Sequence, residues 1–100
     1  MAHVKQALEE KTKKKAITPR LYKVLLLNDD YTSMEFVIAV LMGIFHHDLE
    51  NATRIMYLVH QNGKGVCGVY VREIAETKVA QVRKKALEEK FPLRAIMEEE

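Results

Sequence analysis

Residues 21–36 read LYKVLLLNDDYTSMEF, in which an apolar run is followed by three polar residues and then by apolar residues at helical spacing. The run 21–27 has the length and composition of a β-strand. The three polar residues that follow it are Asn28, Asp29 and Asp30. Such side chains are favoured in turns because they bond to nearby backbone, but together they also form an acidic mouth that suits a small cationic group.

The segment after this acidic mouth is predicted to start a helix. Thr32 and Glu35 have the spacing of a capping box, which places the start of the helix near Ser33. Apolar residues then recur at helical spacing as far as Phe45, so the predicted helix covers residues 33–46.

The rest of the chain alternates between helical and extended patterns. The further predicted elements are a helix over 49–61, a strand over 65–71, a helix over 74–89 and a strand over 93–97. Asp48 is a suitable N-cap for the first of these helices, and Gly63 a suitable stop. The order β-α-α-β-α-β predicts an α+β fold, with three helices on one face of a small, mainly antiparallel three-stranded sheet.

Composition indicates one small domain without a membrane span. The chain has 100 residues, of which 48% are hydrophobic, enough for a single core. It has no apolar run of about eighteen residues, and its N-terminus lacks the apolar segment of a secretory signal. The single cysteine, Cys67, excludes an intrachain disulfide framework and is expected to be a small core residue. We therefore expect a cytoplasmic protein.

Charge is distributed unevenly along the chain. Residues 1–20 contain six Lys or Arg and two Glu, a net charge of +4; because the whole chain carries +2, residues 21–100 carry −2. Residues 1–19 are therefore expected to be a flexible basic extension, and residues 20–100 the folded core domain. The lysines between Lys11 and Lys15 also leave open a small nucleic-acid- or protein-binding module led by this extension.

The predicted helix over 49–61 presents a candidate binding face. Met56, Val59 and His60 share this face because they are spaced by three and four residues. Methionine and an edge histidine more often belong to a core, so the face alone does not decide between packing and binding. The four histidines and Cys67 lack the spacing of zinc ligands, and we expect no metal site.

Five stretches of the chain together indicate a family. They are YKVLLLNDDYTSMEFV (22–37), ATRIMYLVH (52–60), GKGVCGV (63–69), IAETKV (74–79) and FPL (91–93). In order and spacing they resemble the bacterial ClpS adaptors over roughly residues 20–97. One departure is Ser33, where these adaptors usually have proline at the first helical position. We expect serine to leave the pocket chemistry unchanged and to cost at most a modest amount of stability.

The resemblance implies recognition of N-degrons. Proteins of this family bind the free N-terminus of a substrate whose first residue is Leu, Phe, Tyr or Trp. They deliver it to the N-terminal domain of a ClpA-type or ClpC-type AAA+ unfoldase, for degradation by ClpP. The resemblance thus implies a monomeric adaptor that is not an enzyme, has no cofactor and binds neither a specific nucleic acid nor a membrane.

The resemblance also assigns roles to residues. The α-amino group is expected to be bound by Asn28, Asp29, Asp30 and His60. The pocket for the first side chain is expected to be lined by Thr32, Met34, Val37, Met56, Val59 and Leu93, with Met34 matching the family's gate methionine. The surface that docks to the unfoldase is expected to contain Glu73, Glu76, Thr77 and Lys78. A small enzyme that uses Asp29, Asp30 and His60 as acid and base is the remaining alternative, but the chain lacks a nucleophile partner, a phosphate loop and a metal set.

Overall fold

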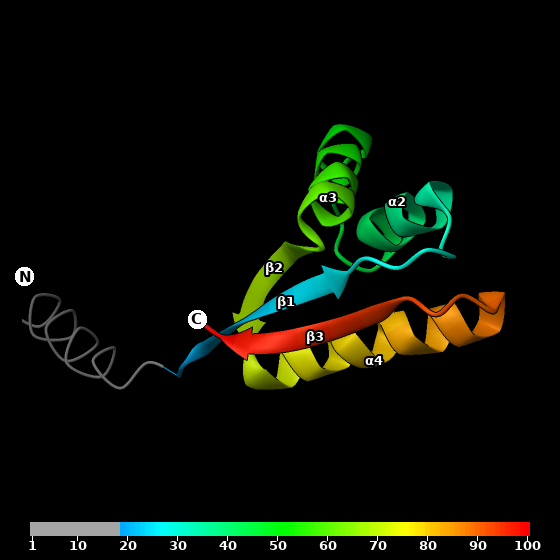
Figure 1. Ribbon diagram of the computed structural model, residues 1–100. Helices are drawn as coiled ribbons and strands as arrows, with labels where there is room; N and C mark the ends of the chain where they lie inside the picture. The colour runs from blue at the N-terminus through cyan, green and yellow to red at the C-terminus, as the bar shows by residue number, and fades with distance from the viewer. Residues whose placement is uncertain (1–18) are drawn as a thin grey trace, which may run out of the picture.

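Figure 1 shows the protein as a computed structural model, in which residues 19–100 are described. The elements are β1 (Leu21–Leu27), α2 (Met34–Gly43), α3 (Leu49–Asn62), β2 (Lys64–Val71), α4 (Arg72–Glu89) and β3 (Arg94–Glu99). The predicted α+β fold and its element order are confirmed. The predicted extension over 1–19 lies almost entirely outside the described residues and stays a prediction.

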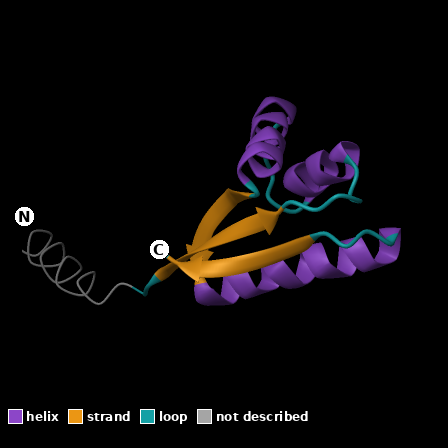
Figure 2. Ribbon diagram, viewed as in Figure 1, coloured by secondary structure: helices purple, strands orange, loops and turns teal. Residues whose placement is uncertain are grey.

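The three strands form one antiparallel sheet in the order β2-β1-β3 (Figure 2). The central strand, β1, has the bounds that were predicted from the sequence. Along one side it pairs with β3, from Tyr22 opposite Glu99 to Leu27 opposite Arg94. The end of β1 therefore lies next to the beginning of β3, and this end of the sheet carries the polar segment that follows Leu27.

One hydrophobic core joins the sheet to all three helices. Val24 and Leu26, two residues apart and thus on the same face of β1, are fully buried in it. Leu41 of α2, Ala52 of α3 and Val82 of α4 are completely covered in the same cluster. In Figure 1, α4 runs alongside β3, whereas α2 and α3 lie together near the end of β1. Burial of each of these Val and Leu side chains contributes about 1.5–3 kcal/mol to stability.

A β-bulge lies in the middle of β2. The pairing between β1 and β2 shifts by one residue between Val24 and Leu25, which leaves Cys67 as an extra residue. Its carbonyl oxygen is 2.6 Å from His47 Nε2, and because a carbonyl can only accept, this ring nitrogen donates. The Cys67 side chain is 2% exposed, and burial raises the pKa of its thiol to about 12. The interpretation of Cys67 as a core residue is confirmed.

The start of α2 differs in detail from the prediction. The helix begins at Met34 with Ser33 as its N-cap, and the Ser33 hydroxyl accepts a hydrogen bond of 3.1 Å from Phe36 N. The predicted capping box at Thr32 is wrong, because the Thr32 hydroxyl donates to Asp29 instead. Serine therefore supplies a side-chain cap here, which proline cannot do.

The bounds of the helices also show where the sequence pattern misleads. The first helix ends at Gly43 and not at residue 46, because glycine disfavours helix and His46 takes the left-handed conformation with φ 60°. The last helix begins two residues earlier than predicted, at Arg72, without a side-chain cap. In α3 the prediction of Asp48 as N-cap and Gly63 as stop is confirmed, with Gly63 at φ 86°.

Candidate functional site

A cavity of about 370 Å³ opens where the end of β1, the start of α2 and the last turns of α3 meet. Its lining contains nine of the ten residues predicted for the amino-group site and the apolar pocket. The residues around it are Asn28, Asp29, Asp30, Thr32, Ser33, Met34, Val37, Met56, Val59 and His60. Residues far apart in the sequence are thus brought together at one site.

The cavity has an apolar floor and a polar rim. Val37, Met56 and Val59 are buried, with at most 7% of each exposed. Asn28 and His60, which line the same cavity, are exposed. A ligand with a charged end and an apolar end would place the charged end in water at the rim and the apolar end on the buried floor.

The backbone brings the end of β1 next to the end of α3. Asn28 N donates a 2.8 Å hydrogen bond to the carbonyl oxygen of Gly63, which follows α3. His60 lies in the last turn of that helix. The left-handed conformation of Gly63, which favours glycine, therefore helps to place Asn28 and His60 at the same rim. Sequence reasoning identified Gly63 only as a helix stop and missed this contact.

The two neighbouring aspartates have different surroundings. Asp29 accepts hydrogen bonds from Tyr31 N at 2.8 Å, Thr32 N at 2.7 Å and the Thr32 hydroxyl at 2.7 Å. Burial alone would raise the pKa of Asp29, but the bonds from Thr32 and Tyr31 outweigh it and hold this pKa below its ordinary value. Asp30 is exposed, and its carboxylate has no hydrogen-bond or ion-pair partner within residues 19–100. Asp29 thus fixes the turn, whereas Asp30 is available to a ligand.

Met34 and Leu93 lie at opposite ends of the apolar part. Met34, the first residue of α2, is 53% exposed at the cavity rim. Leu93 is 5% exposed and is the predicted residue that does not line the main cavity. It lines a smaller void of about 20 Å³ that shares Thr32, Val37 and Val59 with the main cavity. Leu93 therefore lies behind Val37 and Val59 of the floor, across this small void.

Ser33 is the lining residue that the predicted site left out. Its position follows from its role as N-cap, because a cap lies at the turn from which the helix starts. Polar residues at the entrance of a helix next to a candidate mouth were the signal that could have identified it.

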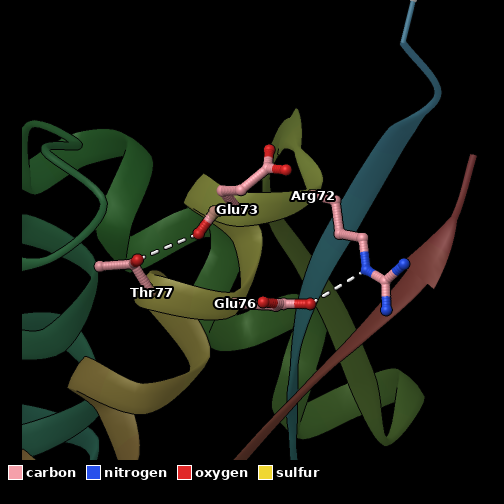
Figure 3. A network of polar contacts seen from close by, with 4 residues as sticks. All are labelled: Arg72, Glu73, Glu76 and Thr77. Carbon is pink, nitrogen blue, oxygen red and sulfur yellow. Dashed lines mark hydrogen bonds and ion pairs between the residues drawn. The ribbon is translucent and has the colours of Figure 1, made fainter.

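The residues predicted to dock to a partner lie on the first two turns of α4, and Figure 3 shows three of them with Arg72. Arg72 Nε donates to Glu76 Oε1 at 3.0 Å, and the Thr77 hydroxyl donates to the carbonyl oxygen of Glu73 at 3.0 Å. The hydrogen bond to Glu76 raises the pKa of Arg72. The carboxylate of Glu73 points away from the other three side chains. Glu73 is exposed, and its carboxylate has no hydrogen-bond or ion-pair partner within residues 19–100.

Lys78 is held inside the molecule more firmly than a surface lysine. Its Nζ donates a 2.6 Å hydrogen bond to the carbonyl oxygen of Ile44, the C-cap of α2. The ammonium also lies 5.8 Å from the centroid of the Tyr70 ring. Lys78 therefore links α4 to the end of α2. If Lys78 also docks to a partner, its ammonium group must contact that partner while it bonds to Ile44, or must give up this bond.

The described part of the chain also bears on a metal-binding and on a membrane-spanning role. Within residues 19–100, no three His, Cys, Asp or Glu side chains converge as ligands of a metal ion. None of the helices in the same range is long and apolar enough to cross a membrane.

Comparison with known proteins identifies the family. Residues 17–96 match the family described as ATP-dependent Clp protease adaptor protein ClpS. The chain belongs to the ClpS family. The resemblance inferred from its five stretches is thereby confirmed, and the protein is a Clp protease adaptor. ClpS adaptors catalyse no reaction, so the interpretation as a small enzyme is wrong.

ClpS proteins of several bacteria are similar over most of their length. The ClpS of Wolinella succinogenes is 58% identical over 81 residues, which are 81% of this chain and 79% of the relative. That of Phenylobacterium zucineum is 54% identical over 99% of this chain and 91% of the relative. Among solved structures, Agrobacterium tumefaciens ClpS2 bound to L-phenylalaninamide has a TM-score of 0.80 and 44% identity, covering 82% of this chain and 99% of that one.

Proposed function

We propose that this adaptor binds proteins whose free N-terminus begins with Leu, Phe, Tyr or Trp and delivers them to a Clp-family AAA+ unfoldase in the cytoplasm. The observation that carries the proposal is the cavity itself. Its rim has the side chains of Asn28, Asp30 and His60, which form no hydrogen bond within residues 19–100, and its floor is apolar and buried. A free N-terminus with a large apolar first residue has the same two parts.

The rim has the chemistry to bind an α-ammonium group, which offers three donors and one positive charge. Asn28 accepts one hydrogen bond through its side-chain oxygen, and Asp30 accepts another while supplying the opposite charge. A neutral His60 accepts the third through a ring nitrogen. Asp29 contributes negative field and holds the turn on which Asp30 lies.

The floor takes the first side chain of the substrate. In this proposal Thr32, Met34, Val37, Met56, Val59 and Leu93 surround that side chain. Burial of a Leu or Phe side chain contributes about 1.5–3 kcal/mol, and each charge-assisted hydrogen bond about 1.5–3 kcal/mol. The association cost is at least about 4 kcal/mol. Micromolar affinity, about −8 kcal/mol, is therefore expected, and it allows the adaptor to release its cargo.

The bound ligand of a relative supports this assignment. Agrobacterium tumefaciens ClpS2 was solved with L-phenylalaninamide, a small molecule with a free α-amino group and an aromatic side chain. The two chains share 44% of their residues in a common fold. A ligand of the same class fits the charged rim and the apolar floor of this cavity.

Delivery requires a second surface, which we place on α4. Glu73, Glu76, Thr77 and Lys78 are proposed to contact the N-terminal domain of a ClpA-type or ClpC-type unfoldase, with the adaptor acting as a monomer. The exposed carboxylate of Glu73, which has no partner within residues 19–100, is the group that we expect to contact the unfoldase. The other polar groups already have partners within the chain, so we expect them to shape this surface more than to supply its affinity.

Titration with fluorescent peptides that differ only in their first residue tests the proposal. Peptides that begin with Leu, Phe, Tyr or Trp should bind with micromolar affinity, and those that begin with Ala, Lys or Asp should bind at least tenfold more weakly. Acetylation of the N-terminus should abolish binding of all of them. Equal affinity across the series, or binding that survives acetylation, would contradict the proposed function.

A further inference from the structure

A second cavity, of about 470 Å³, lies between α4 and the beginning of β3. One wall is a stripe of α4 that contains Val79, Arg83 and Leu87 at helical spacing. The other wall is formed by Leu93, Arg94 and Ala95, where the chain enters β3. Leu93 also lines the small void next to the floor of the first cavity, so this side chain belongs to the surroundings of both cavities.

The strand that borders this groove is at an edge of the sheet. β3 pairs with β1 along one side, and in the part of the chain that the structure describes no strand pairs with its other side. An edge strand presents backbone N–H and C=O groups that a further extended chain can pair with. In Figure 1, β3 and α4 run side by side, and the cavity lies where the chain enters β3.

The groove carries positive charge that nothing in the described chain neutralises. Arg83 and Arg94 both line it and are both exposed, and no acidic side chain lines it. Neither forms an ion pair within residues 19–100, whereas Arg20 pairs with Glu99 and Arg72 with Glu76. Guanidinium groups bind carboxylates in a bidentate geometry, so the pair favours an acidic occupant.

We propose that an extended, acidic segment of a partner protein binds in this groove by adding as a strand to the free edge of β3. Its backbone pairs with the edge, as in other cases of β-strand addition. Its carboxylates, two residues apart and thus on the same face of the added strand, meet Arg83 and Arg94. The far end of β3 carries Glu98 and Glu99, each already in an ion pair, and no arginine, so the segment is placed on the half that begins at Arg94.

Blocked peptides test this inference without involving the first cavity. The acidic probe is the hexapeptide Thr-Val-Asp-Val-Asp-Thr, acetylated and amidated so that it has no α-ammonium group. Its basic twin has Lys for both Asp, and a third peptide has Pro for both Val, because proline has no N–H to pair with a strand. Chemical shifts of the 15N-labelled protein are followed during titration, and affinities are measured by anisotropy.

The acidic probe should bind with a Kd below about 1 mM and shift the amides of residues 94–96 and of the α4 stripe. Arg83→Gln with Arg94→Gln should weaken it at least about tenfold, while Arg54→Gln on the exposed side of α3 should leave it unchanged. The basic and proline peptides should not bind. Absence of saturable shifts at β3, equal binding of the basic peptide, or an equal loss in Arg54→Gln would overturn the inference.

Discussion

At the mouth of the first cavity, the side chains of Asn28, Asp30 and His60 have no hydrogen-bond partner within residues 19–100, whereas on the first turns of α4 most polar groups are already paired. Arg72 holds Glu76, and Lys78 holds the end of α2. A buried apolar floor lies under the first set. Polar groups left open above an apolar floor mark a ligand site, whereas paired polar groups mainly stabilise the fold.

The same contrast separates two adjacent residues. Asp29 and Asp30 have the same side chain, but the first accepts three hydrogen bonds from its own turn and the second accepts none in the described chain. Sequence reasoning placed both in the amino-group site. The geometry indicates that Asp29 stabilises the turn and that Asp30 is available to a ligand. We therefore expect substitution of Asp29 to change stability and substitution of Asp30 to change binding.

Removing the carboxylate of Asp30 should give the largest effect on binding. Asp30→Ala should weaken an N-terminal Phe peptide at least about tenfold, because it removes a charge-assisted hydrogen bond of about 1.5–3 kcal/mol. The thermal unfolding midpoint should stay the same, since no intramolecular bond is lost. Anisotropy titration and circular dichroism measure the two quantities. Glu35→Ala, which removes a nearby charge that does not line the cavity, is the control and should bind like the natural chain.

Shortening Met34 should change selectivity by a smaller factor. Its exposed side chain lines the rim, where in the proposed binding mode a substrate side chain would pass it and residues branched at Cβ, such as Ile and Val, would clash. In Met34→Ala the ratio of Leu to Ile peptide affinities should shrink about fivefold, or about 1 kcal/mol. If every peptide weakens by the same factor, Met34 is ordinary lining and no gate.

Lys78 should affect stability before it affects docking. Lys78→Met removes the hydrogen bond to Ile44 and should lower the free energy of unfolding by about 1 kcal/mol. Thr77→Val, its neighbour on the helix, should change it by less than about 0.5 kcal/mol. Urea unfolding of both variants measures the difference. Equal stability of the two would show that the contact with Ile44 contributes nothing and that Lys78 is free for a partner.

Asp29 should give the smallest effect, a difference in stability that is present near neutral pH and disappears in acid. Its pKa is lowered in the folded state from an ordinary value of 3.8, so its charge stabilises the fold above that pH, and this contribution is lost as the pH falls through the lowered value. Asp29→Asn keeps a hydrogen-bond acceptor but has no charge to titrate. Between pH of about 4 and about 2, its unfolding midpoint should fall less steeply than that of the natural chain. Parallel curves would contradict the assignment.

The strands and the order of elements followed from sequence, because apolar runs and helical spacing report directly on which face is buried. β1 and the caps of α3 were predicted to within a residue. The N-cap of α2 was misplaced by one residue, since Thr32 and Ser33 both have a hydroxyl and only the turn at Asp29 decides which one is taken.

The members of the site were largely predictable, but their division of work was not. Asp29 and Asp30 look alike in sequence, and Lys78 reads as a solvated residue of a charged helix face. Which carboxylate is already bonded, and which lysine reaches a carbonyl 34 residues away, depends on the tertiary fold. The β-bulge at Cys67, which places its carbonyl against His47, likewise has no local sequence signal.

The central claim is that the polar rim of the cavity binds a free α-ammonium group, while the apolar floor binds the side chain next to it. Calorimetric titration with L-phenylalaninamide and with 3-phenylpropanamide, which differ only in the amino group, tests it most directly. We predict that loss of the amino group weakens binding at least about thirtyfold, or about 2 kcal/mol, because several charge-assisted hydrogen bonds are lost together. Equal affinity of the two compounds would show that the cavity selects only the aromatic ring, and would contradict the account.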